Sequence, residues 1–343
     1  MQNFYSIFES NHAVEASSQL EQSDFAKLNQ TVGDLFSNGE SPDRTVHSAV
    51  YEILTARLVG ERDSECGWAY LPAASLLLLS YDQYLQGYSQ IVGVGNELQL
   101  PLTQKKLTDE IKGICNNSSC SINHPLFAYI SSKATKPELG YILASENPCD
   151  LNFVHLLSLL LPGISGSPAL EIIDNFYDEM GRGQLDSFHA TMRLKQMASA
   201  GLKTDDSILS AENYFTSELR HFNAYALNGF RRDRHFYLIG MMFATEFLVP
   251  SQLEVIVNAW CRTGTPASDM KYMSDHLAGD VEHGEGWGRS VVGPLCENNV
   301  ERQRAVLMGV GLHIAILTTL YDNILDALTS GEWRESKLLK KQN

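Results

Sequence analysis

The sequence predicts an all-α helical bundle. In almost every segment beyond residue 45, apolar residues recur every three or four positions, which is the spacing of one face of an amphipathic helix. Alternating runs of β-branched residues joined by hairpin turns, which would indicate a sheet, are missing from the sequence. The sequence also lacks an internal repeat and a low-complexity tract, so a helical bundle is the architecture that remains.

The first third of the chain is expected to form a helical module of its own, residues 1–120. Residues 1–45 are polar, and the stretch 37–45 is typical of a loop. Helical spacing follows in 49–59 and 71–92, and the GVGNE segment at 93–97 ends the second of these helices. A loop rich in turn-forming residues at 113–124 is the expected boundary with the next domain.

Helical spacing continues through the expected second domain, residues 121–335. Each of its periodic segments is long enough for a helix and is bounded by Gly, Pro or polar residues. These segments are 124–134, 136–146, 150–161, 167–180, 188–200, 208–227, 235–249, 250–260, 267–292 and 300–328.

Charge and cysteine content narrow the class of protein. Lys and Arg number 26 against 41 Asp and Glu, a net charge of −15, which argues against nucleic acid or an anionic membrane as partner. The six cysteines form no CxxC pair, and a chain of this size needs no disulfides for its core. The amino terminus lacks the pattern of a secretory signal, and the apolar runs at 72–79 and 153–164 are too short to span a bilayer. We expect a soluble, cytoplasmic protein.

The segment SDHLAGDVEHGEGW carries the strongest chemical signal. His276, Asp280 and His283 stand at i, i+4 and i+7, which places them within about 60° of one another on a single helix. Two imidazoles and a carboxylate are ligands that suit iron, manganese or zinc, and they are the set used by non-haem iron oxygenases. The alternative interpretation is a solvated polar helix face.

Two further segments supply candidate ligands. Glu179 precedes a break at Gly181 and Gly183, and His189 opens the next amphipathic segment, so both side chains could face one cavity. Glu246 lies in an otherwise apolar helix, where a carboxylate is costly unless it meets a cation. The plain alternatives are a carboxylate at a helix end, a half-buried histidine and a hydrogen-bonded buried acid.

A ferritin-like ligand set competes with this one. Glu218 and His221 form a carboxylate-x-x-His pair, as Asp280 and His283 do, and this spacing holds di-iron centres in ferritin-like bundles. The set would be completed by Glu179 and Glu246. An Asp in place of Glu and the glycine break after Glu179 fit it less well, so we rank it second.

The segments HPLFAYI (124–130), NFYDEMGRGQLDSFHATM (175–192), ATEFLVP (244–250) and YMSDHLAGDVEHGEGW (272–287) resemble those of haem-oxygenase-like di-iron oxidases, the iron-containing redox enzymes. The resemblance covers about residues 124–330 and implies a haem-oxygenase-like bundle without haem. Carried over by position, it implies six metal ligands, namely Glu179, His189, Glu246, His276, Asp280 and His283. The long N-terminal module is unusual for the family.

The resemblance further implies two iron ions with O2 as co-substrate. Members of the family oxidise amino acids, amines or aliphatic acids by N-oxygenation, desaturation or C–C cleavage, often in natural-product pathways, and an external electron donor is compatible with that chemistry. A metal-free, thiaminase-like enzyme of the same fold is the other alternative. We expect a homodimer, which is common among helical enzymes. As substrate contacts we expect Arg289 or Arg231 to bind a carboxylate, with Met242 and Phe243 beside Glu246 in the pocket wall.

Overall fold

The computed structural model describes residues 22–36, 42–60 and 71–339, with all of their side chains except those of residues 22–26, 89–92 and 278–281. The described part is helical, and its one β-type contact is an isolated bridge between Leu202 and Leu339. The expected all-α fold is therefore confirmed. Five cysteines have free thiols, namely Cys115, Cys120, Cys149, Cys261 and Cys296. Cys66 lies outside the described residues.

The helices follow one another with short connections. Before residue 120 they are α2 (Gln22–Asp34), α3 (Arg44–Leu58), α4 (Pro72–Val92) and α5 (Gln104–Asn116). The middle of the chain forms α6 (Pro125–Ser132), α7 (Lys136–Ser145), α8 (Asn147–Asp150), α9 (Phe153–Ser158), α10 (Ser167–Glu179) and α11 (His189–Ser199). The last part forms α12 (Thr216–Phe230), α13 (His235–Arg262), α14 (Lys271–Gly286), α15 (Gly293–Cys296) and α16 (Val300–Ser330).

Short irregular helices join these elements. The 3₁₀ turns are η3 (Gly181–Gly183), η4 (Leu185–Ser187), η5 (Asp206–Leu209), η6 (Ala211–Asn213), η7 (Arg232–Arg234), η8 (Ala267–Met270) and η10 (Glu332–Glu335). A π-helical segment, η9 (Trp287–Val292), continues α14 directly. One helix was missed by the sequence analysis, because α5 runs into the stretch that we expected to be a loop. Its end at Asn116 still precedes the turn-rich residues.

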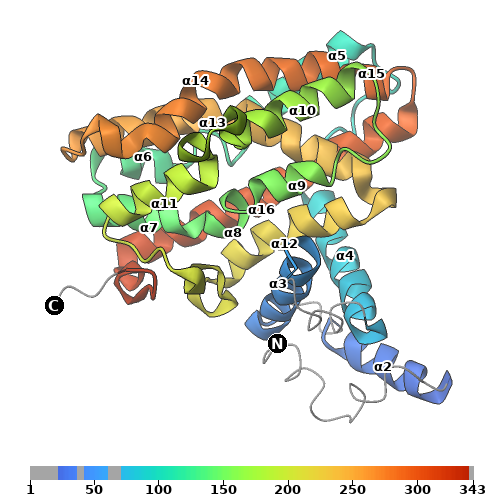
Figure 1. Ribbon diagram of the computed structural model, residues 1–343. Helices are drawn as coiled ribbons and strands as arrows, with labels where there is room; N and C mark the ends of the chain where they lie inside the picture. The colour runs from blue at the N-terminus through green and yellow to red at the C-terminus, as the bar shows by residue number, and fades with distance from the viewer. Residues whose placement is uncertain (1–21, 37–41, 61–70, 340–343) are drawn as a thin grey trace.

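The centre of the bundle is the pair α13 and α16, which pack along each other. Glycine allows their backbones to touch: a Cβ on Gly240 would lie 2.1 Å from the Val306 carbonyl oxygen, and one on Gly309 would lie 2.1 Å from that of Tyr237. Helices α10, α13 and α14 lie together above α16 and α12 (Figure 1). Because α10, α13 and α14 carry most of the candidate ligands, this layer positions the site.

The helices of the first third pack against the same bundle. Helix α3 contacts α12, and α4 contacts α16, while α2 lies against α4 at the edge of the molecule (Figure 1). Aromatic side chains seal the contact between α3 and α12, where the Tyr51 and Phe222 rings meet edge to face with centroids 4.9 Å apart. Whether residues 1–120 fold as a separate domain stays a prediction.

Two helices in the described part are long and apolar enough to cross a membrane, by length and composition alone. They are the helices at Arg232–Arg262 and Val300–Ser330, and 61% and 67% of their apolar windows are buried inside the protein. The sequence analysis overlooked their length because polar residues interrupt both. Their burial against each other is consistent with a soluble protein.

Candidate metal centre

Glu179 and His189 meet across the turn between α10 and α11. Helix α10 ends at Glu179, a left-handed turn at residues 181–183 reverses the chain, and α11 begins at His189. The His189 Nδ1 atom lies 2.9 Å from the Glu179 Oε2 atom, and both side chains are largely buried. The glycine-containing break therefore directs the two side chains at each other, as the sequence analysis expected.

Gly181 is the residue on which this turn depends. Its φ is +64°, and a Cβ there would lie 2.4 Å from the Ser187 carbonyl carbon. Any other residue would meet both a strained backbone conformation and a backbone clash. The neighbouring Arg182 also adopts a left-handed conformation, with a φ of 48°.

We expect Gly181→Ala to lower iron binding, because relieving the clash must move Ser187 and with it His189. The measurement is iron per chain after anaerobic Fe(II) loading, together with the melting temperature. Gly201→Ala is the matched control, since Gly201 has a φ of +80° but open space around its Cβ position. Both variants should lose about 1–3 kcal/mol of stability from backbone strain. Equal iron content in the two variants would contradict the prediction.

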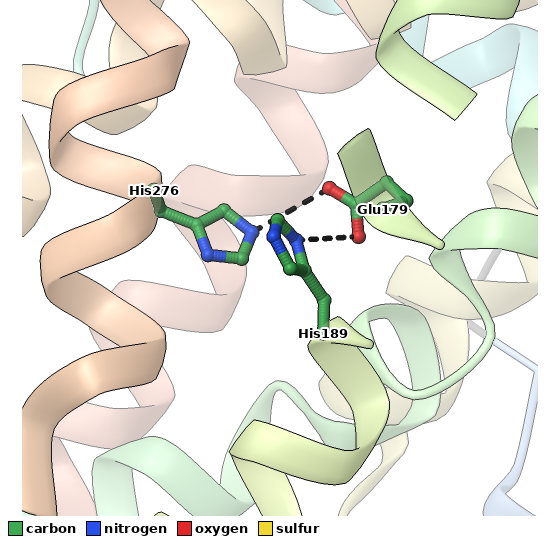
Figure 2. A group of neighbouring side chains, drawn as sticks. All are labelled: Glu179, His189 and His276. Atoms are coloured by element: carbon green, nitrogen blue, oxygen red, sulfur yellow. Dashed lines mark ion pairs between the residues drawn. The ribbon is translucent and has the colours of Figure 1, made fainter. Parts of the chain in front are cut away.

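His276 approaches the same carboxylate from α14. Its Nε2 atom lies 3.5 Å from the Glu179 Oε1 atom, and its ring centroid lies 4.2 Å from that of His189 (Figure 2). The His276 Nδ1 atom lies 3.0 Å from the Tyr272 carbonyl oxygen, which can only accept a hydrogen bond. Nδ1 therefore carries a proton, and Nε2 is the ring nitrogen that faces Glu179 and is available to a metal.

The electrostatics of this group suit a cation. Burial alone would raise the pKa of Glu179, but the close imidazoles of His189 and His276 outweigh it and lower the pKa to about 2. The buried His189 Nδ1 atom is close to the carboxylate yet lacks the geometry of a hydrogen bond with any described group. Glu179, His189 and His276 offer ligand atoms that lie within 4.8 Å of one another. One carboxylate and two imidazoles are a donor set that iron accepts.

His283 lies two turns further along α14 and meets a different set of residues. Its Nε2 atom lies 2.9 Å from the Asp178 Oδ2 atom, and its Nδ1 atom lies 2.9 Å from the Asn175 Nδ2 atom. The Glu246 Oε2 atom is 3.8 Å from the His283 Nδ1 atom. The buried carboxylate of the apolar helix α13 thus has an imidazole nearby, as its desolvation requires.

Asp174, Asp178 and His283 form a second group with metal-ligand geometry. This group is more exposed, and Arg182 already pairs with both carboxylates, at 3.2 Å from Asp174 and in direct contact with Asp178. A resident guanidinium supplies the positive charge that a metal would supply. We therefore interpret Asp178 as a residue that orients His283 and not as a ligand.

Asp280 is the sixth residue that the resemblance implies as a ligand. Its backbone lies in α14 between His276 and His283, but its side chain lies outside the described residues. The helix itself approaches α13 closely at this level, because a Cβ on Gly284 would lie 2.9 Å from the Glu246 carbonyl oxygen. Its role as a ligand stays a prediction.

A cavity of about 110 Å³ opens beside the metal-ligand group, and Glu179, Glu246 and His276 form part of its wall. This space exceeds the roughly 10–15 Å³ that a single water molecule needs. Most of the other lining residues are apolar, namely Leu126, Phe127, Ile130, Ile142, Phe153, Leu248, Val249, Leu253, Ile256, Met273, Leu317 and Ile324. The polar ones are Glu146, Asp150, Arg193, His221, Thr245, Gln252, Tyr272, His313 and Tyr321. A small, mainly apolar molecule could therefore reach the metal-ligand group.

The four residues expected to contact substrate do not line this cavity. Arg289 is exposed on η9, and Arg231 pairs with Asp82 and Asp233 at 3.1 and 2.6 Å. Met242 and Phe243 are fully buried in the core, and although they lie about one turn before Glu246 on α13, they do not reach the cavity. The roles of all four residues in substrate binding stay predictions.

In the structure, Glu218 and His221 of the ferritin-like ligand set do not meet at one site. The Glu218 carboxylate caps the start of α12 by accepting a hydrogen bond from the Phe215 backbone N–H at 2.7 Å. It belongs to neither group of residues with metal-ligand geometry in the described chain. His221, one turn later, lines the cavity instead.

Sequence reasoning missed several residues of the site. Asn175 and Asp178 follow each other at i and i+3 on α10 and both contact His283, a spacing that could have been noticed in DNFYDE. Arg193 and Glu146 gave no signal, because α11 and α7 are brought to the cavity only by tertiary packing.

The protonation of the Glu146 carboxyl group affects the stability of the protein. Burial, and then the charge of Asp150, raise the pKa of Glu146 well above its ordinary range. The unfolded chain releases this proton near pH 4.3. Above that pH the folded state binds one proton more than the unfolded state, so its stability falls as pH rises, until Glu146 ionises in the folded protein as well.

Replacing Glu146 by a neutral residue should therefore increase the stability of the folded protein most at high pH. We expect the stability of Glu146→Gln relative to the natural protein to increase from pH 5 to pH 8, by on the order of 1 kcal/mol. Urea denaturation of the metal-free protein at the two pH values measures it. Glu254→Gln, an exposed substitution on α13, should show no such trend. A relative stability that is constant or falls with pH would refute the expectation.

The fold and the site define a class of protein: an all-α bundle that places a His and carboxylate group with metal-ligand geometry beside a mainly apolar cavity. A family model described as an iron-containing redox enzyme matches residues 141–317, and the chain belongs to this family. It is therefore an iron-containing oxidoreductase, as the resemblance of its motifs implied. A search of the curated proteins gives no match.

Solved structures show the same architecture. One is a domain of unknown function with a haem-oxygenase-like fold from Shewanella denitrificans, with a TM-score of 0.51 and 14% identity over 66% of this chain and 92% of that one. Another is a CADD-like protein of unknown function from Nostoc punctiforme, with a TM-score of 0.52 and 16% identity over 68% and 98%. The expected haem-oxygenase-like fold is confirmed.

Proposed function

We propose that this chain is an O2-dependent non-haem di-iron oxidase or oxygenase that acts on a small molecule. The observation that carries the proposal is the position of Glu179, His189 and His276, a largely buried donor set beside a mainly apolar cavity. Family membership supports iron as the metal. A cavity beside the metal favours a catalytic centre over an iron store, which needs no substrate chamber.

The residues divide into two sets of ligands in this proposal. Glu179, His189 and His276 would hold one iron, and Glu246 with His283 would hold the other, together with Asp280 as the resemblance implies. Two iron ions would supply the electrons and the open positions at which dioxygen is activated. Asp178, which accepts from the His283 Nε2–H, fixes the orientation of that ring, and the Tyr272 carbonyl fixes that of His276.

The protein supplies the surroundings of this chemistry. Apolar side chains from α6, α13 and α16 form much of the cavity wall, which would limit the access of water to the metal-ligand group. Amino acids, amines and aliphatic acids are the substrates proposed, with N-oxygenation, desaturation or C–C cleavage as outcomes in natural-product biosynthesis. A cytoplasmic homodimer served by an external electron donor belongs to the same proposal.

The test is anaerobic loading of the purified chain with Fe(II), followed by exposure to O2 in the presence of a panel of amines, amino acids and fatty acids. About two iron ions per chain and substrate-dependent oxygen uptake are expected. Mass spectrometry then separates oxygenation, loss of two hydrogens and fragmentation. A chain that binds no iron would favour the metal-free, thiaminase-like alternative, and iron loading far above two per chain would favour storage.

A further inference from the structure

The polar groups in the cavity wall fall into two kinds, those with partners and those without. Arg193 is the one permanent cation among the described lining residues, and its guanidinium is already engaged. It pairs with Asp150 and donates to the Asn147 side chain at 2.9 Å, the Tyr272 hydroxyl at 3.2 Å and the Leu143 carbonyl. No cation is therefore left among these residues to receive a substrate carboxylate.

Glu146 is the main group without a hydrogen-bond partner. It lines the cavity, and among the described residues its carboxyl has charge interactions with Asp150 and Arg193 but no hydrogen bond. Burial, and then the like charge of Asp150, raise the pKa of Glu146 and favour its protonated form. A half-buried acid in this position would gain from a cation, because a cation would offset both desolvation and repulsion.

His313 adds an unpartnered acceptor to the same wall. The Met241 carbonyl accepts from the Thr245 hydroxyl at 3.0 Å, which leaves the Thr245 oxygen to accept from the Tyr225 hydroxyl at 2.6 Å. The Tyr225 oxygen then accepts from the His313 Nδ1–H, also at 2.6 Å. Burial lowers the pKa of His313 and keeps the ring neutral, so its Nε2 atom carries a lone pair. That atom is buried without a hydrogen-bond partner among the described residues.

His221 is a second neutral imidazole in the cavity wall. It is 9% exposed, lines the cavity and contacts Tyr225 through its ring, but neither ring nitrogen has a hydrogen bond within the described chain. Burial also lowers the pKa of His221, to about 4, so the ring is neutral and does not repel a cation. The unsatisfied groups in this cavity are thus one acid and two neutral imidazoles, which together call for a positively charged ligand that donates hydrogen bonds.

We propose that the cavity binds a small, mainly apolar amine whose protonated nitrogen pairs with Glu146, while its hydrocarbon part lies against the apolar wall next to the metal-ligand group. The substrate class within the proposed function is then an amine and not an aliphatic acid. Asp150 and Arg193 act as a fixed ion pair that keeps the acidic end of the cavity in place.

The test compares three probes of equal chain length, hexylamine, hexanol and hexanoate, by titration calorimetry on the full chain with Fe(II) under anaerobic conditions. We expect hexylamine to bind at least about tenfold more tightly than either of the others, since a hydrogen-bonded charge pair contributes that much. Glu146→Gln should weaken hexylamine about tenfold and leave hexanol unchanged. Glu254→Gln, which removes an exposed charge from α13, should leave both unchanged.

Two further measurements distinguish a loss of amine binding from misfolding of the variant. Glu146→Asp keeps the charge and should recover part of the hexylamine affinity, and circular dichroism checks that each variant is folded. Hexanoate binding as tightly as hexylamine, no hexylamine binding at millimolar concentration, or unchanged binding in folded Glu146→Gln would each overturn the inference. It rests on the proposed function only for the fate of the amine: missing oxygen uptake with intact amine binding would refute the oxidase and leave the binding site standing.

Discussion

Glu179→Ala is expected to lose most of the bound iron and to reduce substrate-dependent oxygen uptake by at least about 100-fold, because even residues outside the ligand set of a metal change activity by 10–100-fold. The Glu179 carboxylate lies between His189 and His276, with oxygen-to-nitrogen distances of 2.9 and 3.5 Å. Without its carboxylate, two imidazoles would remain to hold a dication. Elemental analysis and an oxygen electrode measure the two effects.

The matched control for this variant is Asp186→Ala, in the turn between Glu179 and His189. The Asp186 side chain is 94% exposed and pairs with Lys195 on the surface, so its loss should leave iron content and oxygen uptake near those of the natural protein. Retention of two iron ions and full activity in Glu179→Ala would exclude this residue as a ligand.

Arg193→Met should destabilise the fold by about 3–5 kcal/mol, the usual cost of removing one partner of a buried ion pair. Arg193 is 1% exposed and joins α11 to the Asn147 and Asp150 side chains, to the Leu143 carbonyl and to Tyr272 on α14. A methionine fills similar space but leaves the Asp150 charge without its counter-ion. Urea denaturation of the metal-free protein gives the difference in free energy of unfolding.

Lys195→Met controls for the loss of a positive charge two residues later on α11. The Lys195 side chain is 59% exposed and pairs with Asp186, so we expect a change of at most about 1 kcal/mol. Replacing Asp150 by Leu together with Arg193→Met should recover part of the stability, since it also removes the uncompensated charge. Equal decreases in the free energy of unfolding for Arg193→Met and Lys195→Met would show that the ion pair of Arg193 and Asp150 stabilises the fold no more than a surface pair does.

The helices and the turn that carry the candidate ligands could be predicted because each depends on local sequence. Helical spacing placed His276 and His283 on one helix, and the glycine break placed Glu179 before a turn and His189 after it, as the structure has them. Glu246 in an apolar helix was expected to need a cation, and in the structure the His283 imidazole lies 3.8 Å from its carboxylate. These conclusions follow from periodicity, backbone preference and desolvation.

The partners of each ligand could not be predicted in the same way. His276 and His283 share a helical stripe, but His276 meets Glu179 while His283 meets Asp178 and Glu246. Two turns of helix separate them by about 10 Å along the axis, so they reach different neighbours. Met242 and Phe243 precede Glu246 by about one turn but do not line the cavity, which local sequence does not show.

The sequence by itself therefore determined the all-α class, the helices that carry the metal-ligand group and the glycine break that joins Glu179 to His189. Only the tertiary structure decided which side chains meet, because that depends on how closely helices approach one another. Gly240 and Gly309 allow α13 and α16 to touch, and Gly284 brings α14 to the backbone of Glu246. These contacts join residues far apart in the chain, and the helical periodicity of the sequence does not predict them. The cavity, with Glu146 in its wall, is a product of that packing.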